Sequence, residues 1–319
     1  CLASDSAVIL MYHRFGESDF PSTNTRIAQL EDHIRVLTAG PYNVMPVLQI
    51  VSRIKRGDSL PEKTVGITVD DGFRSIYTEA WPRFSKAHLP FTIFVATDPI
   101  ENSNSGYLDW DQIREMRRSG VTFGAHTASH IHLVDASRKE IEAEIQRSND
   151  RFTNELGEPP KLFAYPFGET SKEVIHAVSV GRYQYAFGQH SGVVNRSSSF
   201  RYLPRFALNE KYGRLNRFKL VINTLPIPVF GFTPADSIIK MVNPPHIGFT
   251  VMTDLKHLSR ISCFTTSEGR VSSTLLGTSR IEVRMTKPFF KRRTRLNCTL
   301  PGVDGRWHWL GALFVLPKP

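Results

Sequence analysis

Short apolar runs alternate with amphipathic helical segments from residue 7 to about residue 206, and this alternation constrains the fold most. Six runs are candidate strands: residues 7–12, 65–69, 91–96, 121–125, 162–165 and 183–187. Each is almost continuously apolar, which is typical of strands covered on both faces in a parallel sheet. The chain therefore predicts an α/β architecture, either a barrel or an open sheet.

The helical segments carry their own signals. An apolar stripe recurs at three- and four-residue spacing through Ile27, Leu30, Ile34 and Leu37. Ser137 precedes Glu140 by three residues, which predicts a capping box at a helix start. In barrels and open sheets alike, functional groups gather at the carboxyl ends of the strands, so residues directly after the apolar runs are the first candidates for chemistry.

The pattern changes after about residue 225. The Pro-rich stretch 225–237 predicts a linker. Six alternating apolar and polar runs follow it, at residues 246–253, 260–266, 270–276, 280–286, 293–299 and 306–316. No helical pattern interrupts them, so they predict a small antiparallel β-sandwich. We therefore expect two domains, 1–225 and 226–319, with the second as an accessory to the first.

Composition sets broad limits. Hydrophobic residues make up 40% and charged residues 22% of the chain, as in ordinary globular proteins. No apolar run approaches the roughly 20 residues that span a bilayer. The net charge of +10 favours contact with anionic polymers or surfaces. Basic and aromatic residues are interleaved only in the short run 287–295, so nucleic acid is not the predicted partner.

The chain has three cysteines. Cys263 and Cys298 lie in strand-like runs and could form a disulfide in an oxidising compartment, while two buried free thiols fit equally well. Cys1 opens the sequence and could be a lipid-anchored residue or the tail of a truncated signal peptide.

Three groups of polar residues end apolar runs. Asp70 and Asp71 follow the run 65–69, and His126 and His130 follow the run 121–125. The third group is AYPFGE, residues 164–169. Two histidines at this spacing can converge on one cation if their segment forms a helical turn, and a carboxylate from another strand end can complete the ligand set.

Each group alone has an ordinary structural explanation. Adjacent aspartates before glycine often form a turn, and paired histidines often only donate hydrogen bonds. All three groups together, each at the end of an apolar strand, favour a catalytic metal site with open positions for water and substrate.

The segments TVDDG, HTASH and AYPFG resemble the first three motifs of the polysaccharide deacetylases, the NodB-homology domains of carbohydrate esterase family 4. The resemblance covers roughly residues 5–208 and implies a distorted (β/α) barrel, usually with seven strands. It implies a divalent metal on Asp71, His126 and His130, usually Zn²⁺, with Co²⁺, Ni²⁺ or Mn²⁺ as alternatives. It also implies that Asp70 is the catalytic base.

The same resemblance implies a backbone N–H near Phe167 that holds the oxyanion. The residues assigned to substrate and oxyanion contact are Tyr165, Pro166, Phe167 and Gly168.

The chain departs from the common family pattern at two points. The late Leu-x-His motif that carries the acid in many members is absent after residue 190, and we assign the acid to His13. His13 follows the first strand in LMYHRF, as in the poly-N-acetylglucosamine deacetylases of the family. The alternative is a structural histidine bonded to a loop carbonyl. Ala164 stands where motif three usually has an arginine, and Arg205 is the candidate replacement, with a surface salt bridge as the alternative.

Other residues have weaker claims. His132 is expected to be exposed, and His190 is expected to serve a loop. Trp307 and Trp309 share one face of the last strand, where filling the sandwich core is favoured over stacking on sugar rings.

The predicted function is metal-dependent N-deacetylation of an N-acetylglucosamine-containing polysaccharide, in the periplasm, in the cell envelope or outside the cell. The sandwich either supports the barrel or contacts carbohydrate. One alternative is an O-acetyl esterase acting on a polysaccharide such as acetylated xylan. The other is a non-catalytic carbohydrate-binding or scaffold protein on a decayed barrel.

Overall fold

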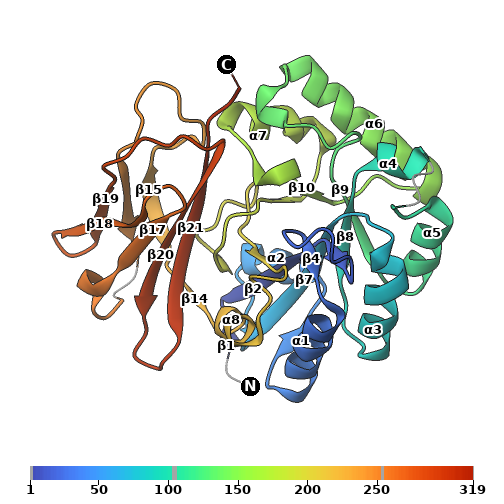
Figure 1. Cartoon of the computed structure of the whole chain (residues 1–319), viewed down its shortest axis with the longest axis horizontal. Helices are drawn as coiled ribbons and strands as arrows, with labels where there is room; N and C mark the ends of the chain where they lie inside the picture. The colour runs from blue at the N-terminus through green and yellow to red at the C-terminus, as the bar shows by residue number, and fades with distance from the viewer. Residues whose placement is uncertain (1–2, 103–105, 253–254, 319) are drawn as a thin grey trace.

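The computed structural model describes residues 3–102, 106–252 and 255–318. The lipid anchor considered for Cys1 lies outside these residues. Figure 1 shows an α/β part in blue to yellow beside a β-rich part in orange and red. Within the described ranges, no helix combines the length and the apolar character that a bilayer crossing needs.

A curled, largely parallel sheet forms the α/β part. Its main path is β11-β10-β9-β8-β7-β2. The bounds are β2 Ser6–Tyr12, β7 Thr64–Asp71, β8 Thr92–Val95, β9 Thr122–Ala125, β10 Leu162–Ala164 and β11 Tyr185–Phe187. These strands are the six predicted apolar runs, and runs consecutive in sequence are neighbours in the sheet. The parallel α/β prediction is confirmed.

A short segment after β11 joins the two ends of this sheet. Leu203 forms a parallel bridge with Phe187 of β11. Three residues later the chain enters β13 (Phe206–Ala207), which pairs in parallel with β2 at Leu10 and Met11. Residues 203–207 therefore form a short seventh strand segment between β11 and β2. The sheet curls into the distorted barrel that the family resemblance implies.

Helices connect the strands. Their bounds are α1 Ile27–Ala39, α2 Val47–Arg56, α3 Trp81–Lys86, α4 Thr97–Glu101, α5 Trp110–Arg118, α6 Arg138–Leu156, α7 Lys172–Val178 and α8 Leu215–Val221. Minor strands of the same part are β1 Ala3–Ser4, β3 Arg14–Phe15, β4 Asn24–Thr25, β5 Asn43–Val44, β6 Leu60–Pro61 and β12 Val194–Asn195. The Ser137 side chain accepts from the Glu140 N–H, so the predicted capping box is confirmed.

Eight strands build the β-rich part, in the order β14-β21-β20-β17-β18-β19-β16-β15. Their bounds are β14 Leu225–Pro226, β15 Val229–Thr233, β16 Ile247–Val251, β17 Ser262–Thr265, β18 Gly269–Leu276, β19 Arg280–Arg284, β20 Arg293–Pro301 and β21 Trp307–Val315. The first half of β18 pairs with β17 and the second half with β19. The strand thus passes from one layer to the other, around a core that includes Phe249 and Phe314, as the sandwich prediction expects.

The Pro-rich stretch 225–237 is not a linker. It contributes β14, which pairs with β21, and β15, which pairs with β16. These strands stand at the two ends of the strand order. Proline is tolerated at such edges because an edge strand leaves one row of its N–H groups unpaired.

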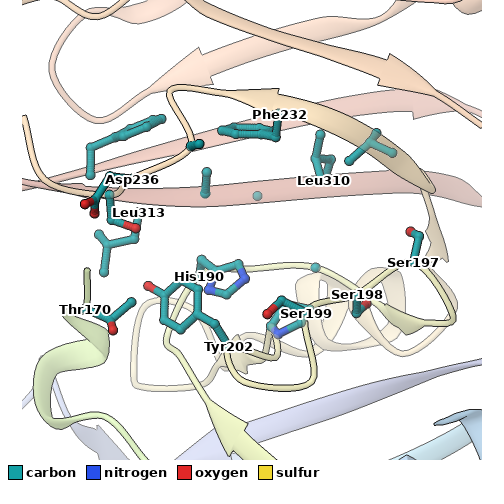
Figure 2. A pocket seen from close by; sticks show the side chains of 18 of the residues that line it. Thr170, His190, Ser197, Ser198, Ser199, Tyr202, Phe232, Asp236, Leu310 and Leu313 are labelled. Carbon is teal, nitrogen blue, oxygen red and sulfur yellow. The ribbon is translucent and has the colours of Figure 1, made fainter. Parts of the chain in front are cut away.

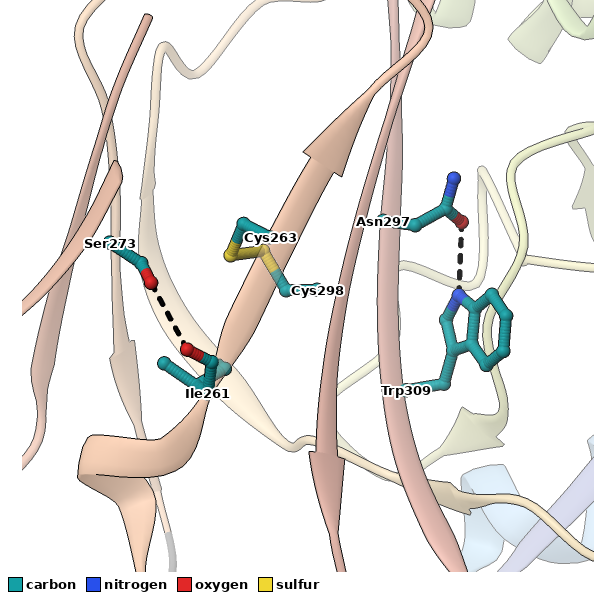
Figure 3. The surroundings of a disulfide bond; sticks show 6 residues. All are labelled: Ile261, Cys263, Ser273, Asn297, Cys298 and Trp309. Carbon is teal, nitrogen blue, oxygen red and sulfur yellow. Dashed lines mark hydrogen bonds between the residues drawn. A yellow bond between two sulfur atoms is a disulfide. The ribbon is translucent and has the colours of Figure 1, made fainter. Parts of the chain in front are cut away.

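Cys263 and Cys298 form a disulfide between neighbouring strands (Figure 3). The two residues face each other in the antiparallel register of β17 and β20. Both are fully buried in the sandwich core. Of the two alternatives left open by the sequence, the structure has the disulfide.

The tryptophans of β21 do not fill the sandwich core. Trp307 is 39% exposed. Trp309 instead packs on the barrel, with its ring centroid 5.3 Å from that of Phe206. Its indole N–H donates to Asn297 Oδ1 at 3.0 Å (Figure 3). Trp309 therefore helps to join the sandwich to the barrel.

A buried histidine in the middle of α1 predicts how stability depends on pH. His33 Nε2 donates to the Gly213 carbonyl at 2.7 Å, so the neutral ring accepts the Tyr12 hydroxyl at Nδ1, 3.0 Å away. Burial lowers the pKa of His33 to about 4. Because the unfolded chain binds a proton near pH 6.5 and the folded chain does not, stability falls as the pH drops from 6.5 to 4.

We expect protonation of His33 in the unfolded chain to lower the free energy of unfolding by about 3 kcal/mol between pH 6.5 and pH 4. Urea unfolding at several pH values measures the effect. His33→Gln keeps a donor and an acceptor without titrating, so its curve should be flatter than that of the wild type. His246→Gln, at an exposed histidine, is the matched control. Parallel curves for the wild type and His33→Gln would contradict the assignment.

Candidate metal and catalytic site

The carboxyl ends of β7 and β9 bring three predicted metal ligands together. Ligand atoms of Asp71, His126 and His130 all lie within 4.8 Å of one another. Asp71 Oδ1 is 3.3 Å from His126 Nε2 and 3.2 Å from His130 Nε2. Two imidazoles and one carboxylate form a donor set that suits a catalytic zinc site, because further positions stay open to water and substrate.

His126 is oriented as a metal ligand would be. Its Nδ1 donates to the Ala164 carbonyl at 2.7 Å, which leaves Nε2 unprotonated in the neutral ring. Nε2 is buried and has no hydrogen-bond partner among the described residues. A buried nitrogen lone pair directed at a carboxylate and a second imidazole is unfavourable unless a cation joins them. The residues present therefore fit a divalent metal.

The HTASH segment is a kinked loop and not the helical turn that the spacing suggested. Thr127 and His130 have φ of 64° and 58°, in the left-handed region. Asp71 is left-handed as well, with φ of 76°. Such backbone strain persists only where surrounding contacts enforce it, and it is common at functional sites. Here it turns the ligand side chains toward one point.

Glu144 of α6 holds this loop and is absent from the predicted site. Its Oε2 accepts the N–H groups of Ala128 and Ser129 at 3.1 and 2.7 Å, and its Oε1 accepts the Ser129 hydroxyl. Its sequence signal is a carboxylate on the apolar face of α6, next to Ile145. A charged residue on a buried face needs a partner, but the sequence does not identify which.

Asp70, the predicted base, forms a bidentate pair with Arg205. The distances are 2.6 Å from Nη1 to Oδ1 and 2.8 Å from Nη2 to Oδ2. Both side chains are fully buried, which does not fit the alternative of a surface salt bridge. The guanidinium also donates to Gly188 O and Thr68 Oγ1, so neighbouring strands hold it in place. Arg205 reaches the site from the segment that closes the barrel.

Charges of opposite sign keep both aspartates ionised. Burial alone would raise the pKa of Asp70, but the positive charge of Arg205 outweighs it and the pKa is lowered. Burial also opposes ionisation of Asp71, whose pKa nevertheless falls well below its usual value because the His126 and His130 imidazoles lie beside it. The two adjacent carboxylates thus have separate partners on opposite sides of the strand.

His13 lies at the same end of the barrel. The parallel register pairs Tyr12 with Val69, and one further step sets His13 beside Asp70. Burial lowers the pKa of His13, partly offset by the charges of Asp71 and Asp70. Among the described residues no hydrogen bond is found for its imidazole, which disfavours a structural role on a loop carbonyl. A lowered pKa makes the protonated imidazole a stronger acid.

Motif three offers one N–H group to the site. Phe167 has φ of 60°, and its N–H has no acceptor among the described residues. The other three predicted residues are less suited: Pro166 has no N–H, the Gly168 N–H donates to Tyr165 O, and the Tyr165 hydroxyl donates to Arg201 O. The predicted oxyanion contact therefore narrows to Phe167.

His132 is half-buried and not exposed as expected. Its ring stacks on Phe167 with centroids 3.9 Å apart and planes at 11°. Its Nδ1 lies 2.8 Å from Oε2 of Glu169, a fully buried carboxylate. His132 and Glu169 thus support the Phe167 loop.

A separate cavity of about 390 Å³ lies between the loop 190–204 and the sandwich (Figure 2). His190 and Tyr202 line its barrel side, and Phe232 and Leu310 line its sandwich side. Burial lowers the pKa of His190 to about 3, so its ring is neutral. None of the three metal-ligand candidates lines this cavity.

Sequence comparisons find related proteins. The family model described as polysaccharide deacetylase matches residues 57–186. The poly-beta-1,6-N-acetyl-D-glucosamine N-deacetylase of Staphylococcus aureus strain MSSA476 is 24% identical over 233 residues, covering 65% of this chain and 80% of that protein.

Solved structures show the same fold. Streptococcus pyogenes deacetylase PplD, in complex with acetate, aligns with a TM-score of 0.63 and 20% identity, over 68% of this chain and 98% of that one. IcaB from Ammonifex degensii aligns with a TM-score of 0.59 and 23% identity, over the same shares of 68% and 98%. The sequence match over residues 57–186 and the shared fold identify a polysaccharide deacetylase domain of the NodB type in this chain.

Proposed function

We propose that the chain removes N-acetyl groups from N-acetylglucosamine units of a polysaccharide in a metal-dependent hydrolysis. The observation that carries this proposal is the convergence of Asp71, His126 and His130, with the unpartnered His126 Nε2, directly beside the Asp70–Arg205 pair. The name of the Staphylococcus aureus relative supports a β-1,6-linked N-acetylglucosamine polymer as the substrate.

Each residue has a defined task in this proposal. A bound divalent cation, with Zn²⁺ expected, supplies Lewis-acid polarisation of the acetamide carbonyl and lowers the pKa of a water. Asp70 accepts the proton of the attacking water, and Arg205 keeps that carboxylate ionised and oriented. The Phe167 N–H donates to the oxygen that becomes negative. His13 protonates the departing amine, so that acetate and a free amino sugar leave.

Acetate release tests the proposal. The substrates are poly-β-1,6-N-acetylglucosamine, chito-oligosaccharides, peptidoglycan and acetylated xylan, each with and without chelator. We expect acetate in stoichiometric amount with new free amines from an N-acetylglucosamine polymer, and none with chelator. Acetate from xylan alone would replace this proposal with the O-acetyl esterase. Binding without acetate from any substrate would favour the non-catalytic scaffold.

The location of the protein follows from the same proposal. Such polymers lie in the cell envelope or outside the cell, and the Cys263–Cys298 disulfide fits an oxidising compartment. We infer a periplasmic, envelope-associated or secreted protein.

The role of His13 has its own test. His13→Ala should lower kcat on the N-acetylglucosamine polymer by about 10²–10⁴-fold, the usual contribution of a general acid. Its effect on p-nitrophenyl acetate should be small, because p-nitrophenolate leaves without a proton. Steady-state kinetics on both substrates measures this difference. Full turnover of the polymer by His13→Ala would remove His13 as the acid.

A further inference from the structure

An arginine of the sandwich domain reaches the loop that carries Phe167. Arg292 donates from Nε to Glu169 Oε1 at 2.9 Å and from Nη2 to Oε2 at 2.7 Å. Its Nη1 lies 3.0 Å from Asp135 Oδ2, on the segment that follows the HTASH loop. One guanidinium thus joins the sandwich to the segments after two of the three motifs.

The contacts continue from Glu169 to Phe167. Glu169 is fully buried, and its Oε2 also faces Nδ1 of His132, whose ring stacks on Phe167. The neighbouring Arg293 donates from Nη1 to the Phe167 carbonyl at 3.4 Å, and its guanidinium lies 5.4 Å from the Phe167 ring centre. Phe167 is therefore held at its ring by His132 and Arg293 and at its carbonyl by Arg293. The two contacts with Arg293 come from the sandwich.

Phe167 needs such support because its backbone is left-handed, with φ of 60°. A non-glycine residue keeps that conformation only where its surroundings enforce it. The N–H direction follows from the same torsion angle, so any relaxation of the loop moves the donor away from the developing oxyanion. A misplacement of about 1 Å can lower a rate by roughly 10²-fold.

We propose that Arg292 is a positioning residue for the Phe167 N–H, so that the sandwich domain is part of the catalytic apparatus. This inference rests on the proposed function, since it assigns the N–H to the oxyanion. Without Arg292, the buried Glu169 carboxylate loses its bidentate partner and must move, take up water or bind a proton. Each of these changes disturbs the stack of His132 on Phe167.

Kinetics on a matched pair of variants tests the proposal. Arg292→Met should lower kcat on the N-acetylglucosamine polymer by roughly ten- to a hundredfold, with KM within about twofold of the wild type. Free guanidinium ion should restore part of that turnover. The control is Arg306→Met, which removes another contact between the domains, from Arg306 Nε to the Asn223 carbonyl at 2.8 Å. We expect wild-type kinetics for this control.

Two further measurements separate positioning from other effects. Zn²⁺ affinity by calorimetry should be unchanged in Arg292→Met, since a loss would show action through the metal ligands and overturn the proposal. Hydrogen exchange of the 165–170 segment should be faster in Arg292→Met than in the wild type or Arg306→Met. Wild-type kcat in Arg292→Met, an equal loss in Arg306→Met, or unchanged exchange would each overturn it.

The hydrogen-exchange measurement does not require the protein to be an active enzyme. If the wild type releases no acetate, the proposed function fails. Faster exchange in Arg292→Met would still show that Arg292 holds the Phe167 loop in place. If Arg292→Met does not fold, Arg292→Lys replaces it, because lysine keeps the charge and loses the second hydrogen bond. A lowered kcat in Arg292→Lys at wild-type melting temperature supports the proposal, and a wild-type kcat overturns it.

Discussion

Asp70→Asn should lower kcat for acetate release by about 10³-fold while Zn²⁺ still binds with one equivalent. Asparagine keeps the shape of the side chain but cannot accept the proton of the attacking water, and a general base contributes about 10²–10⁴-fold. Zn²⁺ binding should persist because Asp71, His126 and His130 are untouched. Acetate assays and calorimetry on the same preparation measure both quantities.

Asp58→Asn is the matched control, since Asp58 is a surface carboxylate paired with Arg56. It should keep wild-type activity and wild-type Zn²⁺ affinity. If Asp70→Asn retained more than about a tenth of the wild-type kcat, Asp70 would not be the base. If it lost Zn²⁺ as well, Asp70 would belong to the ligand set.

Arg205→Met should lower the unfolding free energy by about 3–5 kcal/mol and also suppress turnover. Removing one partner of a buried ion pair leaves an uncompensated charge, and this is the usual cost. Here the charge left is the Asp70 carboxylate, which is fully buried. Turnover falls because Asp70 loses both hydrogen bonds that orient it. Urea unfolding and acetate release measure the two effects.

The double variant Asp70→Asn with Arg205→Met separates charge from packing. It should be more stable than Arg205→Met alone, because no carboxylate is then left buried without its cation. Arg205→Lys should lie between the wild type and Arg205→Met in stability, since lysine keeps a charge but not the planar fork. An Arg205→Met variant within 1 kcal/mol of the wild type would contradict the buried-pair interpretation.

Much of the fold could be predicted because buried parallel strands leave a local signal. Each of the strands β2 and β7–β11 contains an almost continuously apolar run, and the chain order of these strands is also their order in the sheet. The closing segment 203–207 left no such signal. It pairs only through Phe206 and Ala207 and one bridge at Leu203, too few residues to show a period.

The linker prediction for the Pro-rich stretch is wrong for a related reason. Proline in a sequence normally argues against a strand, yet Pro226 lies in an edge strand, where a missing N–H costs little. Whether a strand lies at the edge or in the centre of a sheet depends on the assembled sheet, so the sequence of the stretch alone does not show it. The same limit applies to Trp309, whose barrel neighbour Phe206 lies about a hundred residues earlier in the chain.

The candidate site also contains some residues that the sequence could identify and others that it could not. Asp70, Asp71, His126 and His130 were accessible to prediction because they stand at strand ends within short motifs. Glu144 and Arg292 were not, because the sequence does not show which loop each of them contacts: Glu144 lies 15 residues after Ser129, and Arg292 lies 123 residues after Glu169. Glu169 lies inside the AYPFGE motif, but its burial and its partners His132 and Arg292 appear only once both domains are in place.

The most direct test of the central claim is to titrate Zn²⁺ into chelator-treated enzyme while following acetate release from poly-β-1,6-N-acetylglucosamine. We predict no activity at zero metal, a rise in proportion to added Zn²⁺, and a plateau at one equivalent. His126→Ala should stay inactive throughout, because Nε2 of this ring faces the other two ligands. Full activity in the metal-free wild type, or a wild-type titration curve for His126→Ala, would contradict a catalytic metal at Asp71, His126 and His130.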